Sequence, residues 1–85
     1  MSLVVRVRYF AALREALGAG EEVRLPDGAD LAALRAQLIA SSDGHAKALA
    51  PGRAVRCALN QVMSDEAAAL KPGDEVAFFP PVTGG

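Results

Sequence analysis

The sequence predicts an α+β domain in which one main helix packs on a mixed sheet of about five strands. Several short segments alternate apolar and polar residues, which is the period of half-buried strands. One longer segment repeats its leucines at helical spacing. Glycine, proline and asparagine separate these segments, so each is expected to form an element of its own.

The first strand is expected from Leu3 to Phe10, where every second residue is apolar and faces inward. Ala11 to Leu17 is expected to form a short helical turn, which two glycines end. Glu21 to Leu25 is the second predicted strand. The tripeptide Pro26-Asp27-Gly28 then provides a turn signal.

The main helix is predicted to begin after Asp30, because aspartate is a favourable N-cap residue. Arg35 and Gln37 are expected to lie off its apolar stripe. That stripe repeats at helical spacing and consists of Leu31, Leu34, Leu38 and Ile39. The segment from Ser41 to Arg53 is rich in Ser, Gly, Pro and Ala, so it predicts a loop with room for one helical turn.

The third strand is predicted from Val55 to Leu59, and Asn60-Gln61 is expected to reverse the chain into a short strand at Val62-Met63. Ser64 to Leu70 is predicted to be a connector with one turn of helix. Lys71-Pro72-Gly73-Asp74 fits a type II turn, since Pro stands at its second place and Gly at its third.

The last strand is predicted from Val76 to Phe79 and is expected to lie beside the first. The first two strands are expected to form a hairpin whose inner face the helix crosses. This order of elements is the layout of the ubiquitin-like β-grasp. One domain is therefore predicted over residues 1–85, with a globular part at 1–79 and a functional tail at 80–85.

Composition narrows the possible functions of the chain. Its 85 residues are 52% hydrophobic and carry a net charge of −1, which gives no general case for nucleic acid or membrane binding. No apolar run approaches the length of a membrane span. A single cysteine cannot form an internal disulfide, and no signal peptide precedes the first strand, so a cytoplasmic protein is expected.

The C-terminal residues Pro80-Pro81-Val82-Thr83-Gly84-Gly85 allow two interpretations. One is a frayed terminus, which is common at chain ends. The other is that the carboxylate of Gly85 is the reacting group, since two glycines can be recognised through their backbone alone. The two prolines stiffen the segment, which can span about 20 Å at ~3.3 Å per residue. The strand and the prolines before the glycines favour the second interpretation.

The end of the chain also carries a resemblance to a known family. The residues from Gly73 to Gly85 resemble, over their whole length, the signature of the molybdopterin synthase small subunits, which are ubiquitin-like sulfur carriers. Two less specific motifs agree with that family, Tyr9-Phe10-Ala11-Ala12-Leu13-Arg14-Glu15 and Ala58-Leu59-Asn60-Gln61. Cys57 departs from the family pattern, where a plain apolar residue is expected.

The resemblance implies a specific chemistry at Gly85. Its carboxylate would be adenylated by a partner of the ubiquitin-activating type that uses ATP, and a sulfur donor would convert the adenylate into a thiocarboxylate. The thiocarboxylate would give its sulfur to cyclic pyranopterin monophosphate, which builds the molybdopterin dithiolene. The chain would be a carrier subunit that binds no cofactor and assembles with the large synthase subunit into a heterotetramer. The expected partner-binding residues are Phe79, Pro80, Pro81, Val82, Thr83 and Gly84.

Other readings of the sequence remain open. The same activation could serve thiamine synthesis, transfer-RNA thiolation or conjugation to lysines, and a pure interaction domain would need no chemistry at the tail. Arg6, Arg8, Arg24 and Arg56 are expected to share the outer sheet face, either as ordinary solvated residues or as a patch for acidic partners.

The remaining reactive side chains suggest no site. Cys57 is expected to be a buried and inert thiol because of its inward position on a strand. His45 has no partner at metal-ligand spacing, so no metal site is predicted. The acidic pairs Asp65-Glu66 and Asp74-Glu75 are expected to be solvated turn residues.

Overall fold

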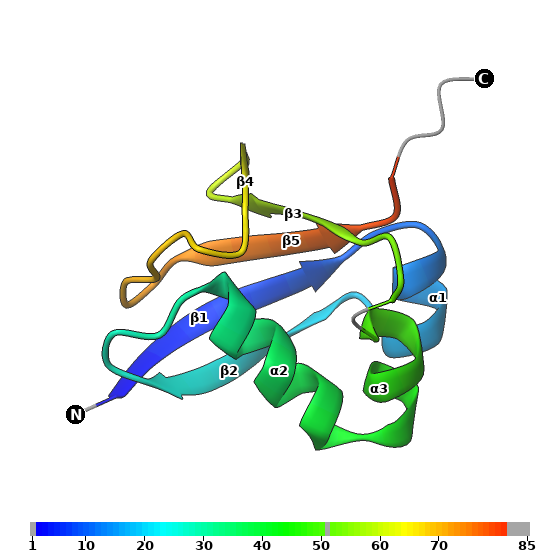
Figure 1. Cartoon of the computed structure of the whole chain (residues 1–85), viewed down its shortest axis with the longest axis horizontal. Helices are drawn as coiled ribbons and strands as arrows, with labels where there is room; N and C mark the ends of the chain where they lie inside the picture. The colour runs from blue at the N-terminus through cyan, green and yellow to red at the C-terminus, as the bar shows by residue number, and fades with distance from the viewer. Residues whose placement is uncertain (1, 51, 82–85) are drawn as a thin grey trace.

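The computed structural model describes residues 2–50 and 52–81 and shows a mixed sheet with helices packed against one face (Figure 1). The predicted β-grasp fold is confirmed. Its elements are β1 (Ser2–Tyr9), α1 (Ala12–Leu17), β2 (Gly20–Pro26), α2 (Leu31–Ser41), α3 (Asp43–Leu49), β3 (Arg56–Leu59), β4 (Val62–Ser64) and β5 (Glu75–Phe79).

The sheet has five strands in the order β2-β1-β5-β3-β4. β1 pairs with β2 in antiparallel fashion and with β5 in parallel fashion, where Val7 lies opposite Val76. β5 also pairs with β3, so it occupies the centre of the sheet. The prediction that the last strand lies beside the first is confirmed. Because β1 and β5 are parallel, their C-terminal ends lie at the same end of the sheet.

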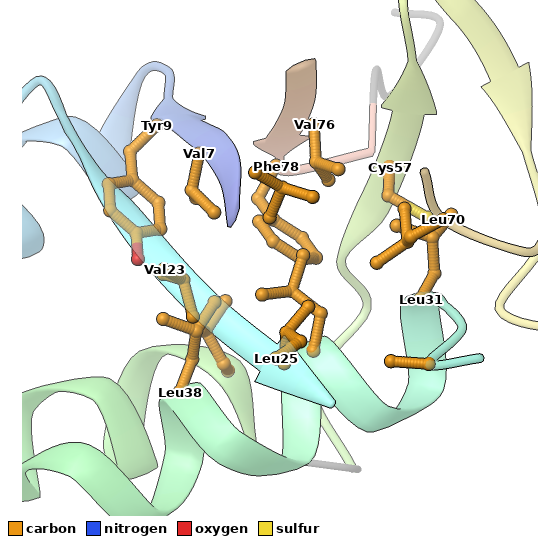
Figure 2. Packing of buried hydrophobic residues seen from close by; sticks show 14 of the residues in the cluster. Val7, Tyr9, Val23, Leu25, Leu31, Leu38, Cys57, Leu70, Val76 and Phe78 are labelled. Carbon is orange, nitrogen blue, oxygen red and sulfur yellow. The ribbon is translucent and has the colours of Figure 1, made fainter. Parts of the chain in front are cut away.

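The core lies between the inner sheet face and α2 (Figure 2). Val7, Val76 and Phe78 project from the two central strands and are at most 2% exposed. The leucine stripe of α2 packs against them, as the helical spacing predicted. Burying a side chain of this size stabilises the fold by roughly 1.5–3 kcal/mol. The tail-bearing strand β5 therefore belongs to the most deeply buried part of the molecule.

Two predicted turns have the expected geometry. Asn60 and Gln61 have φ values of 50° and 70°, the positive pair that a two-residue hairpin of type I′ requires. Gly73 has φ 85°, and the Asp74 N–H donates to the Lys71 carbonyl at 3.1 Å, which fits the predicted type II turn.

Arg35 was expected to lie off the apolar stripe of α2, and this was wrong. It lies one turn after Leu31 on the same helix face and is only 8% exposed. Its Nε donates to the Leu49 carbonyl and its Nη2 to the Ala50 carbonyl, each at 2.8 Å, while Nη1 lies 2.7 Å from Glu66 Oε2. The side chain is buried because it satisfies carbonyls that the end of α3 leaves without helical partners.

Two connectors also differ from the prediction. The segment after α2 is not a loop with a single turn, because α3 forms there with Ser42 as its N-cap, which accepts from the His45 N–H at 3.1 Å. Residues 64–70 were expected to contain a helical turn, but the described chain has none there. Asp65 Oδ1 instead accepts from the Ala67 N–H at 2.9 Å, a local bond that competes with a helix.

Candidate functional site: the root of the C-terminal tail

β5 ends at Phe79, and Pro80 and Pro81 follow at the edge of the sheet where α1 and α3 lie (Figure 1). Phe78 anchors this end, because its ring stacks on that of Tyr9 with centroids 6.3 Å apart. Its carbonyl accepts from the Phe10 N–H at 3.1 Å. The chain is thus held by packing and by a backbone hydrogen bond just before the prolines. We call residues 79–81 the tail root.

The start of β5 is fixed as well. Asn60 Nδ2 donates to Asp74 Oδ1 at 3.0 Å, and Asn60 Oδ1 accepts from the Glu75 N–H at 2.9 Å. Asp74 Oδ2 also accepts from the Lys71 N–H at 2.8 Å. Asp74 therefore acts as a turn residue, as predicted, and its bonds lock the hairpin loop to the strand that carries the tail.

The outer sheet face near the tail root carries apolar side chains. Phe79, one of the expected partner-binding residues, lies on this face opposite Arg56 and is half-buried. The exposed aromatic residue at this edge is Phe10, which is 40% exposed. The strand alternation could have indicated it, since Phe10 is the next outward position after Arg8. On the β3–β4 side, Met63 lies opposite Ala58 and is 58% exposed.

The four arginines do share the outer face and are exposed. They do not form a purely basic patch, because Arg6 lies opposite Glu22 on β2 and Glu75 on β5. The Arg8 guanidinium stands 5.4 Å above the Phe10 ring, a cation–π distance. Charges of both signs therefore lie on the β1–β2 part of the outer face, while on the β3–β4–β5 part the apolar residues Ala58, Met63, Ala77 and Phe79 lie between Arg56 and Glu75.

A hydrogen-bonded network lies beneath the tail root on the inner side. The Tyr9 hydroxyl donates to Glu21 Oε2 at 2.9 Å, and His45 Nε2 lies 2.8 Å from the same oxygen. Burial, together with the Glu21 carboxylate, raises the pKa of Tyr9 well above its ordinary value. The network ties α3 to β2 and β1, so His45 and Tyr9 have a structural role here.

Cys57 is buried, as predicted, and its Sγ donates to the Ser64 carbonyl at 3.3 Å. Burial raises the pKa of the Cys57 thiol, which disfavours the reactive thiolate. Within residues 2–50 and 52–81, no group of three His, Cys, Asp or Glu side chains is placed to hold a metal ion. In the same ranges, no helix is long and apolar enough to cross a membrane.

The structure thus brings together three of the predicted site residues, Phe79, Pro80 and Pro81, at the end of a buried strand. Four further predicted residues lie outside the described residues: Val82, Thr83, Gly84 and Gly85. The fold and the tail root define a β-grasp protein of the ubiquitin-like class.

Comparison with known proteins identifies the family. Residues 7–85 match the ThiS family. The molybdopterin synthase sulfur carrier subunit of Escherichia coli is 42% identical over 82 residues, which cover 96% of this chain and 100% of that protein. The chain therefore belongs to the ThiS family, among the molybdopterin synthase sulfur carrier subunits.

Two solved structures agree with this assignment. A Haloferax volcanii protein solved in solution has a TM-score of 0.81 and 32% identity, and the match covers 99% of this chain and 88% of that one. A chain of the complex between subunits 1 and 2 of the Helicobacter pylori molybdopterin-converting factor has a TM-score of 0.65 and 32% identity. That match covers 98% of this chain and 100% of the other.

Proposed function

We propose that this chain carries sulfur as a thiocarboxylate on Gly85 and delivers it for molybdopterin synthesis. The observation that carries the proposal is the match of residues 7–85 to the ThiS family, because this match runs through the two final glycines. Full-length similarity to molybdopterin synthase sulfur carrier subunits supports cyclic pyranopterin monophosphate as the acceptor.

The proposed chemistry needs an activation step, since a carboxylate is a poor electrophile. A Gly85 carboxylate oxygen attacks the α-phosphorus of ATP on the partner enzyme, and pyrophosphate leaves. Sulfide from a sulfur donor then displaces AMP from the acyl-adenylate, which leaves a thiocarboxylate. The thiocarboxylate sulfur attacks the pterin precursor, and water cleaves the acyl–sulfur bond, which leaves the sulfur on the pterin and restores the carboxylate. ATP belongs to the partner in this scheme, and this chain contributes the acyl group and the tether.

The residues before Gly85 suit a tether that enters a narrow site. Gly84 and Gly85 have no Cβ, so they leave room for a nucleotide and an incoming sulfur atom. Pro80 and Pro81 restrict the backbone, which lowers the entropy cost of ordering the tail on a partner. Because Phe78 anchors the strand in the core, the tether starts from a fixed point.

The large subunit of molybdopterin synthase is the proposed acceptor partner, in a heterotetramer. The Helicobacter pylori relative was solved as a complex of two subunits, which supports such an assembly. On this chain, the outer sheet face is the surface that would meet it, through the apolar side chains of Phe10, Met63 and Phe79. Aromatic residues and methionine are enriched at such interfaces. A partner on this face would lie directly beside the tail root.

Removing Gly85 tests the proposed chemistry. We expect thiocarboxylate formation and sulfur transfer to be lost in a variant that lacks Gly85. The terminal carboxylate would then belong to Gly84, one residue short of the position at which the partner's site takes it. Urea unfolding should be unchanged, since Gly85 follows the last strand, which ends at Phe79, and has no side chain that a core could bury. The matched control is Gly52→Ala, because an added Cβ at Gly52 meets nothing within 4 Å. Undiminished sulfur transfer by the shortened chain would contradict the proposal.

A further inference from the structure

A groove lies at the tail root beside α1 and α3, and the outward-facing residues of the sheet do not line it. Its volume is about 490 Å³, and it runs between α1, α3 and residues 53–55. Pro80 lines it, so the groove is continuous with the tail root. Figure 1 shows α1 and α3 next to each other at the end of the sheet where β5 leaves.

The groove is open because the two helices present small residues to it. Ala12 and Ala16 of α1 and Gly44 and Ala48 of α3 line it. A Cβ built on Gly44 would meet Ser42 Oγ at 3.7 Å and Leu17 Cδ2 at 3.8 Å, which are ordinary van der Waals contacts without a clash. An apolar side chain of a partner can therefore reach down to Leu13, which belongs to the hydrophobic core.

The charged residues that line the groove, Lys47 and Arg53, are both cations. The Arg53 Nε donates to the Lys47 carbonyl at 3.1 Å, which fixes the guanidinium beside the end of α3. Arg35 of α2 fixes the backbone of Arg53, because its Nη2 donates to the Arg53 carbonyl at 3.2 Å. In the described part of the chain, neither cation forms an ion pair with a carboxylate. Both charges are thus positioned at the rim and available to an anionic partner.

We propose that this groove docks an acidic segment of a partner protein that also takes the tail, with an apolar side chain of that segment inserted between α1 and α3. The proposal rests on the proposed function, because it assigns the groove to a protein that receives Gly85. Charge complementarity favours an acidic segment, and continuity with Pro80 places it next to the bound tail. The carrier would then offer different faces of one tail root to the proteins that activate and unload it.

The test measures the affinity of the full chain for the adenylating enzyme and for the large subunit, at low and high salt. Lys47→Glu should weaken binding to at least one of them by about tenfold, with a larger effect at low salt, because a rim charge acts mainly on association. Lys71→Glu is the matched control, since it makes the same change of charge in the turn before β5. It should leave both affinities within about twofold of the original.

A second pair of variants tests the apolar part of the groove. Ala16→Phe fills the groove and should weaken the same complex, whereas Ala40→Phe places the same ring on the exposed face of α2 and should not. Urea unfolding of each variant confirms that the fold is kept. Loss of binding by both groove variants at unchanged stability would support the proposal.

Three outcomes would overturn it. Unchanged affinity of both groove variants for both partners would mean that the groove is not a docking surface, while thiocarboxylate formation on Gly85 would still uphold the proposed function. Tighter binding by Lys47→Glu would mean that the groove holds the anionic tail of this chain itself. Failure of the unaltered chain to form a thiocarboxylate with an active enzyme would remove the proposed function and the groove proposal together.

Discussion

At the scale of single residues, Arg35 connects more segments of the chain than its position on a leucine-rich helix suggests. Its guanidinium bonds the carbonyls of Leu49, Ala50 and Arg53 and pairs with Glu66. It therefore joins α2, the end of α3 and the connector before β5. The helical stripe alone did not predict this role, because a charged residue beside leucines is usually assigned to solvent. The carbonyls that bury it come from residues far along the chain.

We predict that Arg35→Met lowers the free energy of unfolding by about 2–4 kcal/mol, because it leaves buried carbonyls without their donor. Urea denaturation measures the change. Glu66→Gln is the control: it keeps an acceptor for Nη1, and the Glu66 side chain is 49% exposed, so its cost should be about 1 kcal/mol or less. If Arg35→Met lowered the free energy of unfolding no more than Glu66→Gln, the bonds of Arg35 to the three carbonyls would not stabilise the fold.

At the scale of elements, the strands and the helices α1 and α2 were predictable. Alternation of apolar and polar residues located β1 and β2, and the apolar run before the two prolines located β5, each to within one or two residues. The helix α3 was not predicted, because Asp43-Gly44-His45 has the composition of a loop. It forms since Ser42 caps it and Leu49 is fully buried at its end. Only the tertiary structure supplies that burial, so the groove that α3 forms with α1 could not be foreseen.

The pairing of β1 with β2 provides an element-scale prediction. A Cβ on Gly20 would clash with the Val7 carbonyl oxygen and approach the Arg8 Cα to 3.2 Å. Both obstacles are backbone atoms, so the two strands would have to separate locally. We expect Gly20→Ala to destabilise the fold by about 1–3 kcal/mol. Gly52→Ala, which meets no atoms, should change little. Equal urea midpoints for the two variants would show that this close approach is absent.

At the scale of the whole molecule, the β-grasp fixes the tail root at the end of a buried central strand. The parallel pairing of β1 with β5 puts Phe78 next to Tyr9 and sends the prolines out at one edge. The sequence predicted this arrangement, because the tail motif and the strand before it are contiguous. It did not predict that Phe10 and the groove lie beside the tail root, because segments distant in the sequence bring them there. The sequence thus predicts which group would react, whereas the surfaces around the tail root are found only in the folded structure.

The most direct test of the sulfur-carrier assignment is the intact mass of this chain after incubation with ATP, a sulfur source and its adenylating enzyme. We predict a gain equal to the exchange of one oxygen for one sulfur, confined to the peptide that ends at Gly85. Subsequent incubation with the large subunit and the pterin precursor should reverse the gain. An unchanged mass, with an enzyme proven active on another carrier, would contradict the central claim.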